Sequence, residues 1–100
     1  PHGARRPAVL RIARELGLTL VQWNVMGHDW APIGPERILG KVQRGLETAR
    51  VHGRGANILL HDGYDQRMGA DRSATVHATD RLLTELASGS SRIVAVDRWS

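Results

Sequence analysis

The sequence predicts an α/β fold in which helices and parallel strands alternate in the order α-β-α-β-α-β. Stretches with apolar residues on one helical face alternate with short apolar stretches that are rich in β-forming residues. Turns that contain glycine separate them. The first strand-like stretch is also apolar on both of its faces, as in a strand that helices cover from both sides. Elements that alternate in this way connect as right-handed crossovers, so a parallel sheet is expected.

The first predicted helix begins at Pro7, because proline suits the first turn of a helix. Gly17 stands where a left-handed residue commonly ends a helix. The apolar residues that share one face between these two positions are Val9, Ile12, Ala13 and Leu16. The stretch Leu18–Val25 then predicts a strand, because it consists mainly of apolar and β-branched residues.

Pro35 and Glu36 predict the start of a second helix. The residues that share its apolar face are Ile38, Val42, Gly45 and Leu46. After the polar turn Val51–Gly55, the apolar stretch Ala56–His61 predicts the second strand. A long loop, residues 62–72, begins at the end of that strand.

Ser73 is predicted to cap a third helix, which Gly89 ends. Its apolar face is expected to contain Val76, Leu83 and Leu86, with Leu82 beside them. The stretch Arg92–Val96 predicts a final strand.

Both interior strands are followed by polar residues. The first is followed by the segment 24–30, and the second by His61 and Asp62. In parallel α/β sheets, ligands bind at the carboxyl ends of the strands. The sequence therefore predicts a candidate active site at this edge, where side chains from two strands meet.

Composition narrows the choice of function. The chain is 41% apolar and 24% charged, which is ordinary for a globular domain and too apolar for a disordered chain. Its 14 basic residues give a net charge of +4, but they are scattered and not interleaved with aromatic residues, so no nucleic-acid partner is predicted. The absence of cysteine excludes disulfides and thiolate metal sites. No apolar run is long enough for a membrane span.

Three local patterns carry a family resemblance: Pro1-His2-Gly3, the segment Trp23–Trp30 with Asp29 before its last tryptophan, and Ile58-Leu59-Leu60-His61-Asp62-Gly63. In order and spacing they resemble the last three motifs of the NodB-homology polysaccharide deacetylases, carbohydrate esterase family 4. The resemblance covers nearly all of residues 1–100 and identifies them with the C-terminal half of that catalytic domain. It implies part of a distorted (β/α) barrel that removes N-acetyl groups from amino sugars of chitin or peptidoglycan.

The same resemblance implies a role for five residues. His61 corresponds to the histidine that protonates the departing amine, and Asp29 to the carboxylate that pairs with it. Leu59 and Trp30 correspond to apolar residues that line the acetyl pocket. His2 stands where the family often has tyrosine, and its backbone N–H would stabilise the oxyanion.

The family also implies a divalent metal, usually zinc. Its ligands belong to an early Thr-Phe-Asp-Asp motif and a His-x-x-x-His motif, and neither occurs in these 100 residues. No metal ligand is therefore predicted in this chain, and the 100 residues alone are expected to be inactive. Pro1-His2-Gly3 reads like the inside of a loop, so an upstream segment is expected. The resemblance also implies an envelope or external location.

Other interpretations remain open at the level of sequence. A histidine at the end of a buried strand and an aspartate in a turn can be purely structural, which would make the chain an inactive glycan-binding or structural remnant. His61-Asp62 followed by Arg67 also resembles the glycerophosphodiester phosphodiesterases, but that family expects a Glu-x-Asp pair, which is absent here. A partial barrel exposes strand edges and apolar surface, so self-association is expected beside binding of a glycan.

Overall fold

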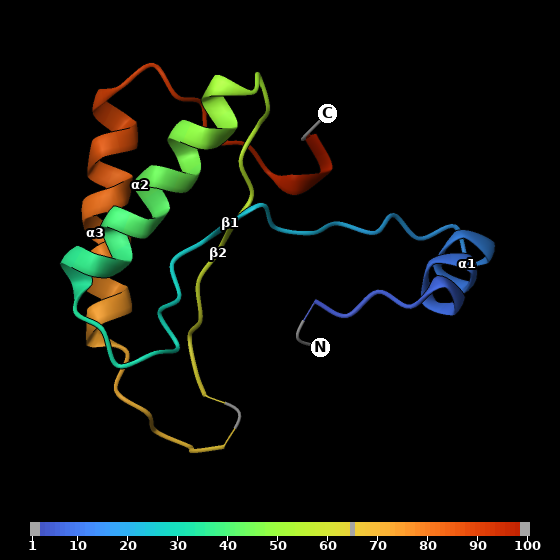
Figure 1. Ribbon diagram of the computed structural model, residues 1–100, viewed down its shortest axis with the longest axis horizontal. Coiled ribbons are helices and arrows are strands. Elements are labelled where there is room, and N and C mark those ends of the chain that lie inside the picture. The colour runs from blue at the N-terminus through green and yellow to red at the C-terminus, as the bar shows by residue number, and fades with distance from the viewer. Residues whose placement is uncertain (1–2, 65, 99–100) are drawn as a thin grey trace.

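The computed structural model describes residues 3–64 and 66–98 and has a mixed α/β architecture (Figure 1). In chain order the elements are α1 (Pro7–Glu15), β1 (Val25–Met26), α2 (Pro35–Val51), β2 (Ile58–Leu59), α3 (Ser73–Ser88) and the 3-10 helix η1 (Val96–Arg98). The predicted alternation of helices with strands is therefore confirmed over the first five elements. None of the described helices is long and apolar enough to cross a membrane.

The two strands pair in parallel, as predicted, with Val25 opposite Ile58 and Met26 opposite Leu59. Asparagine side chains extend the pairing at its start. The backbone N–H of Asn57 donates to Oδ1 of Asn24 over 2.7 Å, and the backbone N–H of Asn24 donates to the carbonyl of Asn57 over 3.0 Å. This ladder fixes the register that brings the two strand ends together.

The predicted extent of the strands is wrong. The stretch Leu18–Asn24 is not a strand, and β2 covers only part of Ala56–His61. The stretch Arg92–Val96 is also not a strand, and Val96 lies in η1. A strand exists only where a neighbour accepts its backbone hydrogen bonds. Among the described residues, β1 and β2 have only each other as partners.

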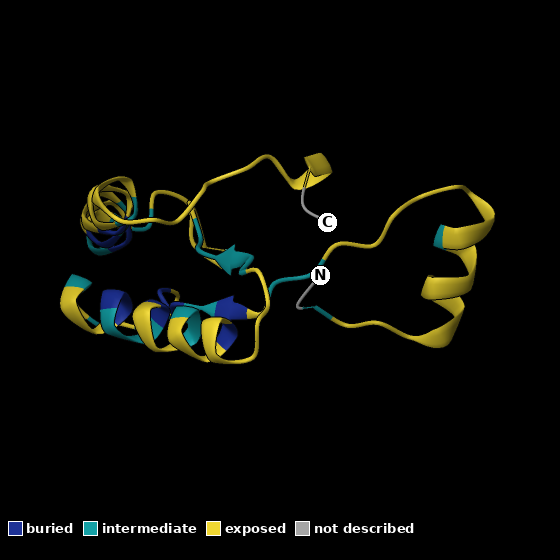
Figure 2. Cartoon of the chain, turned by 90° about the horizontal axis from the view of Figure 1, so that it is seen from above, coloured by how far each residue is buried: buried dark blue, intermediate teal, exposed yellow. Residues whose placement is uncertain are grey.

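The core lies between α2, α3 and the sheet, where buried residues gather in Figure 2. Its central cluster consists of Val25, Leu39, Val42 and Leu82. Ile38 is fully buried beside it. Gly45 lets α2 approach β1 closely, because a Cβ atom at this position would lie 2.7 Å from Cγ1 of Val25. Close packing of helix against strand thus depends on a residue without a side chain.

Helix α3 differs from its prediction in two respects. Ser73 is the first helical residue, not the cap, and its backbone N–H donates to Oδ1 of Asp71 over 2.8 Å. The buried face consists of Thr75, Ala78 and Leu82. Val76 and Leu83, which were expected to face the core, are 62% and 49% exposed. The helix is therefore rotated relative to the orientation that its leucines suggested.

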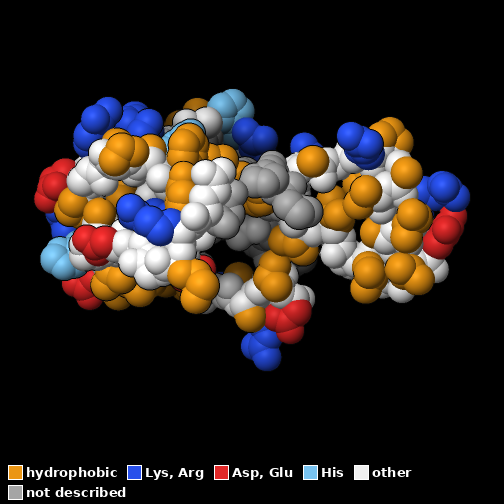
Figure 3. Space-filling model, turned by 90° about the horizontal axis from the view of Figure 1, so that it is seen from below, with side chains coloured by type: hydrophobic (Ala, Val, Ile, Leu, Met, Phe, Trp, Pro, Cys, Tyr) orange, Lys and Arg blue, Asp and Glu red, His pale blue; other side chains and the backbone are white. Residues whose placement is uncertain are grey.

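Residues 4–21, which we call the N-terminal arm, extend away from the rest of the chain and contain α1 (Figure 1). The end of α1 is as predicted. Gly17 has a φ of 68°, and the backbone N–H of Leu18 donates to the carbonyl of Ala13 over 2.8 Å. None of the residues of α1 is buried, and apolar side chains gather over this arm in Figure 3. The arm returns to the sheet at Gln22, whose side-chain amide donates to the carbonyl of Gly3 over 3.0 Å.

Candidate active site

The candidate site lies where the chain leaves the two strands. Asp29 follows β1 shortly after its last residue, and His61 follows β2 in the same way. Because β1 and β2 are parallel, both loops emerge at one edge of the sheet. The structure brings Asp29 and His61 together there, which confirms the prediction that the two strand ends form one cluster.

Asp29 and His61 are joined by two hydrogen bonds. Nδ1 of His61 lies 2.9 Å from Oδ1 of Asp29, and the backbone N–H of His61 donates to Oδ2 of Asp29 over 2.7 Å. An ionised carboxylate can only accept hydrogen bonds, so the proton of the imidazole lies on Nδ1. The carboxylate is fully buried, whereas the imidazole is 37% exposed. Nε2 of His61 is therefore the ring nitrogen left for a substrate.

Two residues at the start of α3 also bind Asp29, and sequence reasoning assigned no role to either. The hydroxyl of Thr75 donates to Oδ2 of Asp29 over 3.0 Å. Nη1 of Arg72 donates to the backbone carbonyl of Asp29 over 2.9 Å. Thr75 shares a helical face with Ala78 and Leu82, which the structure buries, but periodicity alone did not favour this face over the one that contains Val76 and Leu83.

These contacts set the charge of Asp29. Burial alone would raise the pKa of Asp29, because it disfavours the ionised form. The hydrogen bonds from the ring and the backbone of His61, and from Thr75, act in the opposite direction and together hold the pKa of Asp29 below its usual value. A buried anion is thus present beside the imidazole at neutral pH.

A cleft of about 1090 Å³ opens in front of His61. Alternation along β2 and the residues after it explains its lining. Leu59 and His61 point into this cleft, whereas Ile58 and Leu60 line a cavity elsewhere. Trp30, which is 51% exposed, lines the same cleft. Three of the predicted site residues therefore share one space, and Asp29 lies buried beside it.

Other cleft residues were not assigned by sequence. His28 lines the cleft, and the centroid of its ring lies 6.1 Å from that of Trp30. Gly3 and Tyr64 line it as well, from the chain start and from the loop after β2. His2, the remaining predicted site residue, lies outside the described residues.

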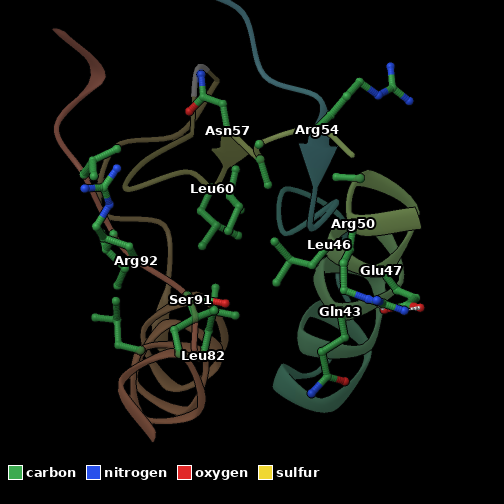
Figure 4. Close-up of a pocket in the computed structure, with 18 of the residues that line it drawn as sticks. Gln43, Leu46, Glu47, Arg50, Arg54, Asn57, Leu60, Leu82, Ser91 and Arg92 are labelled. Carbon is green, nitrogen blue, oxygen red and sulfur yellow. Dashed lines mark hydrogen bonds and ion pairs between the residues drawn. The ribbon is translucent and has the colours of Figure 1, made fainter. Parts of the chain in front are cut away.

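A second cavity lies between α2, α3 and the segment 91–98 (Figure 4). Leu46, Leu60 and Leu82 are among the apolar residues that line it, while Gln43, Glu47 and Arg92 add polar groups. None of the predicted catalytic residues that the structure describes lines this cavity. Ile58 of β2 lines this cavity together with residues of the stretch Arg92–Val96, which was predicted to be a strand and does not form one.

The described residues do not build a metal site. Within residues 3–64 and 66–98, no three His, Asp or Glu side chains lie close enough to hold one ion. Asp29 has both carboxylate oxygens occupied by protein donors. The arrangement therefore suits proton transfer through an oriented imidazole.

Comparison with known proteins finds relatives among curated deacetylases. No family model and no solved structure matches the chain. A peptidoglycan-N-acetylglucosamine deacetylase of Bacillus cereus is 35% identical over 98 residues, which cover 96% of this chain and 41% of that protein. A chitooligosaccharide deacetylase of Bradyrhizobium is 38% identical over 81% of this chain and 33% of its own length. Another from Sinorhizobium fredii is 35% identical over 86% of this chain and 40% of its own length.

The chain is thus related in sequence to curated deacetylases of peptidoglycan and chitooligosaccharides, and it spans less than half the length of each of these relatives.

Proposed function

We propose that residues 1–100 form the C-terminal half of the catalytic domain of a polysaccharide deacetylase of the NodB-homology family, whose complete fold is a distorted (β/α) barrel. The proposed reaction is hydrolysis of N-acetyl groups on a chitin- or peptidoglycan-type glycan. The observation that carries the proposal is the Asp29–His61 pair, whose imidazole faces a cleft lined by Trp30 and Leu59. The relatedness to curated deacetylases supports the same class of reaction.

The proposed role of His61 is that of general acid. In amide hydrolysis water adds to the acetyl carbonyl, the C–N bond breaks, and the nitrogen must take up a proton before it leaves as an amine. Nε2 of the imidazolium supplies that proton, because Nδ1 is engaged by Asp29. The buried carboxylate keeps the ring oriented and stabilises its positive charge. The products are acetate and a free amino sugar.

The other assigned residues contribute shape and charge stabilisation. Trp30 and Leu59 line the space for the acetyl methyl group, where apolar side chains exclude water. The backbone N–H of His2 is proposed to bind the oxyanion. For the complete protein we propose a divalent metal, zinc, held by ligands outside these 100 residues, as the family resemblance implies.

Replacement of His61 tests the proposal. In the full-length protein, His61→Ala should lower the rate of deacetylation of N-acetylglucosamine oligomers about a hundredfold or more, because the leaving nitrogen loses its proton donor. His77→Ala is the matched control, since His77 is an exposed histidine on α3 and should leave the rate unchanged. Released acetate measures the rate, and the 100 residues alone should release none.

Near-normal turnover by the His61→Ala protein would overturn the assignment of the general acid. Absence of acetate release from the unmodified full-length protein would overturn the proposed reaction and favour a glycan-binding remnant, which binding of the same oligomers would then reveal.

A further inference from the structure

We propose that Thr75 is a positioning residue for the Asp29–His61 pair and that Arg72 supports the same pair through the backbone. This inference rests on the proposed function for its catalytic consequence, but its structural basis is independent of the substrate. It assigns to the first turn of α3 the role of holding the carboxylate of Asp29 in one orientation.

The geometry of the carboxylate carries the argument. Oδ1 of Asp29 accepts the Nδ1 proton of His61, and Oδ2 accepts both the backbone N–H of His61 and the hydroxyl of Thr75. The Thr75 bond approaches from α3, whereas both other donors belong to His61. It is therefore the bond that fixes the carboxylate relative to the core, independently of the imidazole that it orients.

The burial of Thr75 agrees with this role. Thr75 is 7% exposed and lies on the face of α3 that otherwise buries Ala78 and Leu82. A hydroxyl is unfavourable at such a position unless it forms a hydrogen bond. The partner that satisfies it is Asp29, so the polar residue at this core position serves the site and not the packing of the helix.

Arg72 acts on the backbone of the same residue. Nη1 of Arg72 donates to the carbonyl of Asp29, and the guanidinium lies 5.5 Å from the centroid of the Tyr64 ring. Nε of Arg72 is buried and has no hydrogen-bond partner among the described residues. Arg72 thus connects the loop after β1, the loop after β2 and the start of α3. Among the described residues, the titratable or charged groups that bind Asp29 are this guanidinium and the imidazole of His61.

The test compares Thr75→Val, which keeps the shape and removes the donor, with Thr75→Ser, which keeps the donor. In the full-length protein, Thr75→Val should lower kcat for N-acetylglucosamine oligomers about tenfold, as loss of one charge-assisted hydrogen bond would. KM should change less than about twofold, because Thr75 does not line the cleft. Thr75→Ser should recover most of the rate.

A second readout does not depend on activity. A ¹³C NMR titration of the Asp29 carboxyl should show a higher pKa in Thr75→Val, because one of the hydrogen bonds that lower the pKa of Asp29 is lost. Thr75→Ser should titrate like the unmodified protein. A merely structural role of Thr75 would not move this titration in the valine variant and restore it in the serine variant.

The outcomes separate the two proposals. If the unmodified protein releases no acetate, the proposed function fails, and the titration alone decides whether Thr75 positions Asp29. If the unmodified protein is active and Thr75→Val keeps both its kcat and its Asp29 titration, the positioning role is overturned while the function stands. Circular dichroism checks folding of each variant, and Thr75→Ala replaces Thr75→Val in both measurements if the valine variant does not fold.

Discussion

Helices α1 and α2 begin and end with the same sequence signals, but they lie in different environments. Each begins with proline, and each is followed by a glycine in the left-handed conformation, Gly17 and Gly53. Both have a distinct apolar face. Helix α2 buries Ile38 and three further residues against β1 and α3, whereas α1 buries none.

The difference separates what local sequence determines from what packing determines. Proline, glycine and apolar spacing determine where a helix begins and ends, and both helices obey them. Burial needs a second surface, which β1 and α3 provide for α2. Short isolated helices are marginal in water, and α1 has only 9 residues. Among the described residues, no other helix or strand packs against α1 as β1 and α3 pack against α2.

The largest effect is expected when a buried isoleucine of α2 is truncated, and an exposed isoleucine of α1 provides the comparison. Ile38 is 0% exposed, so Ile38→Ala should lower the free energy of unfolding by about 2–5 kcal/mol. Ile12 is 48% exposed, and Ile12→Ala should change it by less than about 0.5 kcal/mol. Urea unfolding of the 100-residue chain, followed by circular dichroism, measures both. Equal losses would contradict the comparison, because they would mean that the arm packs as α2 does.

The pairing of Asp29 with His61 could be predicted from the sequence, because its basis is geometric. Apolar stretches that end in polar residues predict strand ends, and parallel pairing places such ends at one edge. That argument needs neither the length of the strands nor their neighbours. It therefore held for Asp29 and His61 although the strand Leu18–Val25 was predicted too long and Arg92–Val96 did not form.

The supporting residues could not be predicted, because they depend on the rotation of α3. Adjacent leucines at 82 and 83 allow two apolar faces, and periodicity alone does not choose between them. Packing buries Leu82 and exposes Leu83, which turns Thr75 toward Asp29. Strand length failed for a similar reason. β-forming residues report a preference for extended backbone, whereas pairing needs a neighbour that the sequence of one strand does not specify.

A smaller effect, confined to the packed region, is expected from Asp29→Asn. The pKa of Asp29 is lowered in the folded chain, so its charge stabilises the fold at pH values above the pKa that Asp29 has in the unfolded chain. That stability is lost as pH falls through the folded pKa. The neutral side-chain amide of the variant has one acceptor oxygen and cannot orient the same donors, so Asp29→Asn should lower the free energy of unfolding by about 1–3 kcal/mol at neutral pH.

The difference between Asp29→Asn and the unmodified chain should shrink toward acid pH, because the unmodified chain then loses the same charge. Urea unfolding at a series of pH values measures it. Asp80→Asn is the control, since Asp80 is exposed on α3 and its substitution should leave stability unchanged at every pH. A constant difference across the series would mean that Asp29 stabilises the chain by shape and not by charge.

The smallest effect on folding, and the sharpest test of the arm, is expected from Ile12→Glu. We propose that the 100-residue chain self-associates through its exposed apolar surface, which on the arm includes Val9, Leu10, Ile12 and Leu16. A charge at position 12 should abolish this association and leave the circular dichroism of the packed region unchanged. Light scattering after size-exclusion chromatography measures the mass. Val76→Glu is the matched control, because Val76 is an exposed apolar residue on α3 and not on the arm.

A stable monomer of the unmodified chain would refute the association, and loss of association in Val76→Glu alone would place the contact on α3 instead. Loss in Ile12→Glu alone would show that the apolar face of α1 lacks only a partner surface to be buried as the face of α2 is.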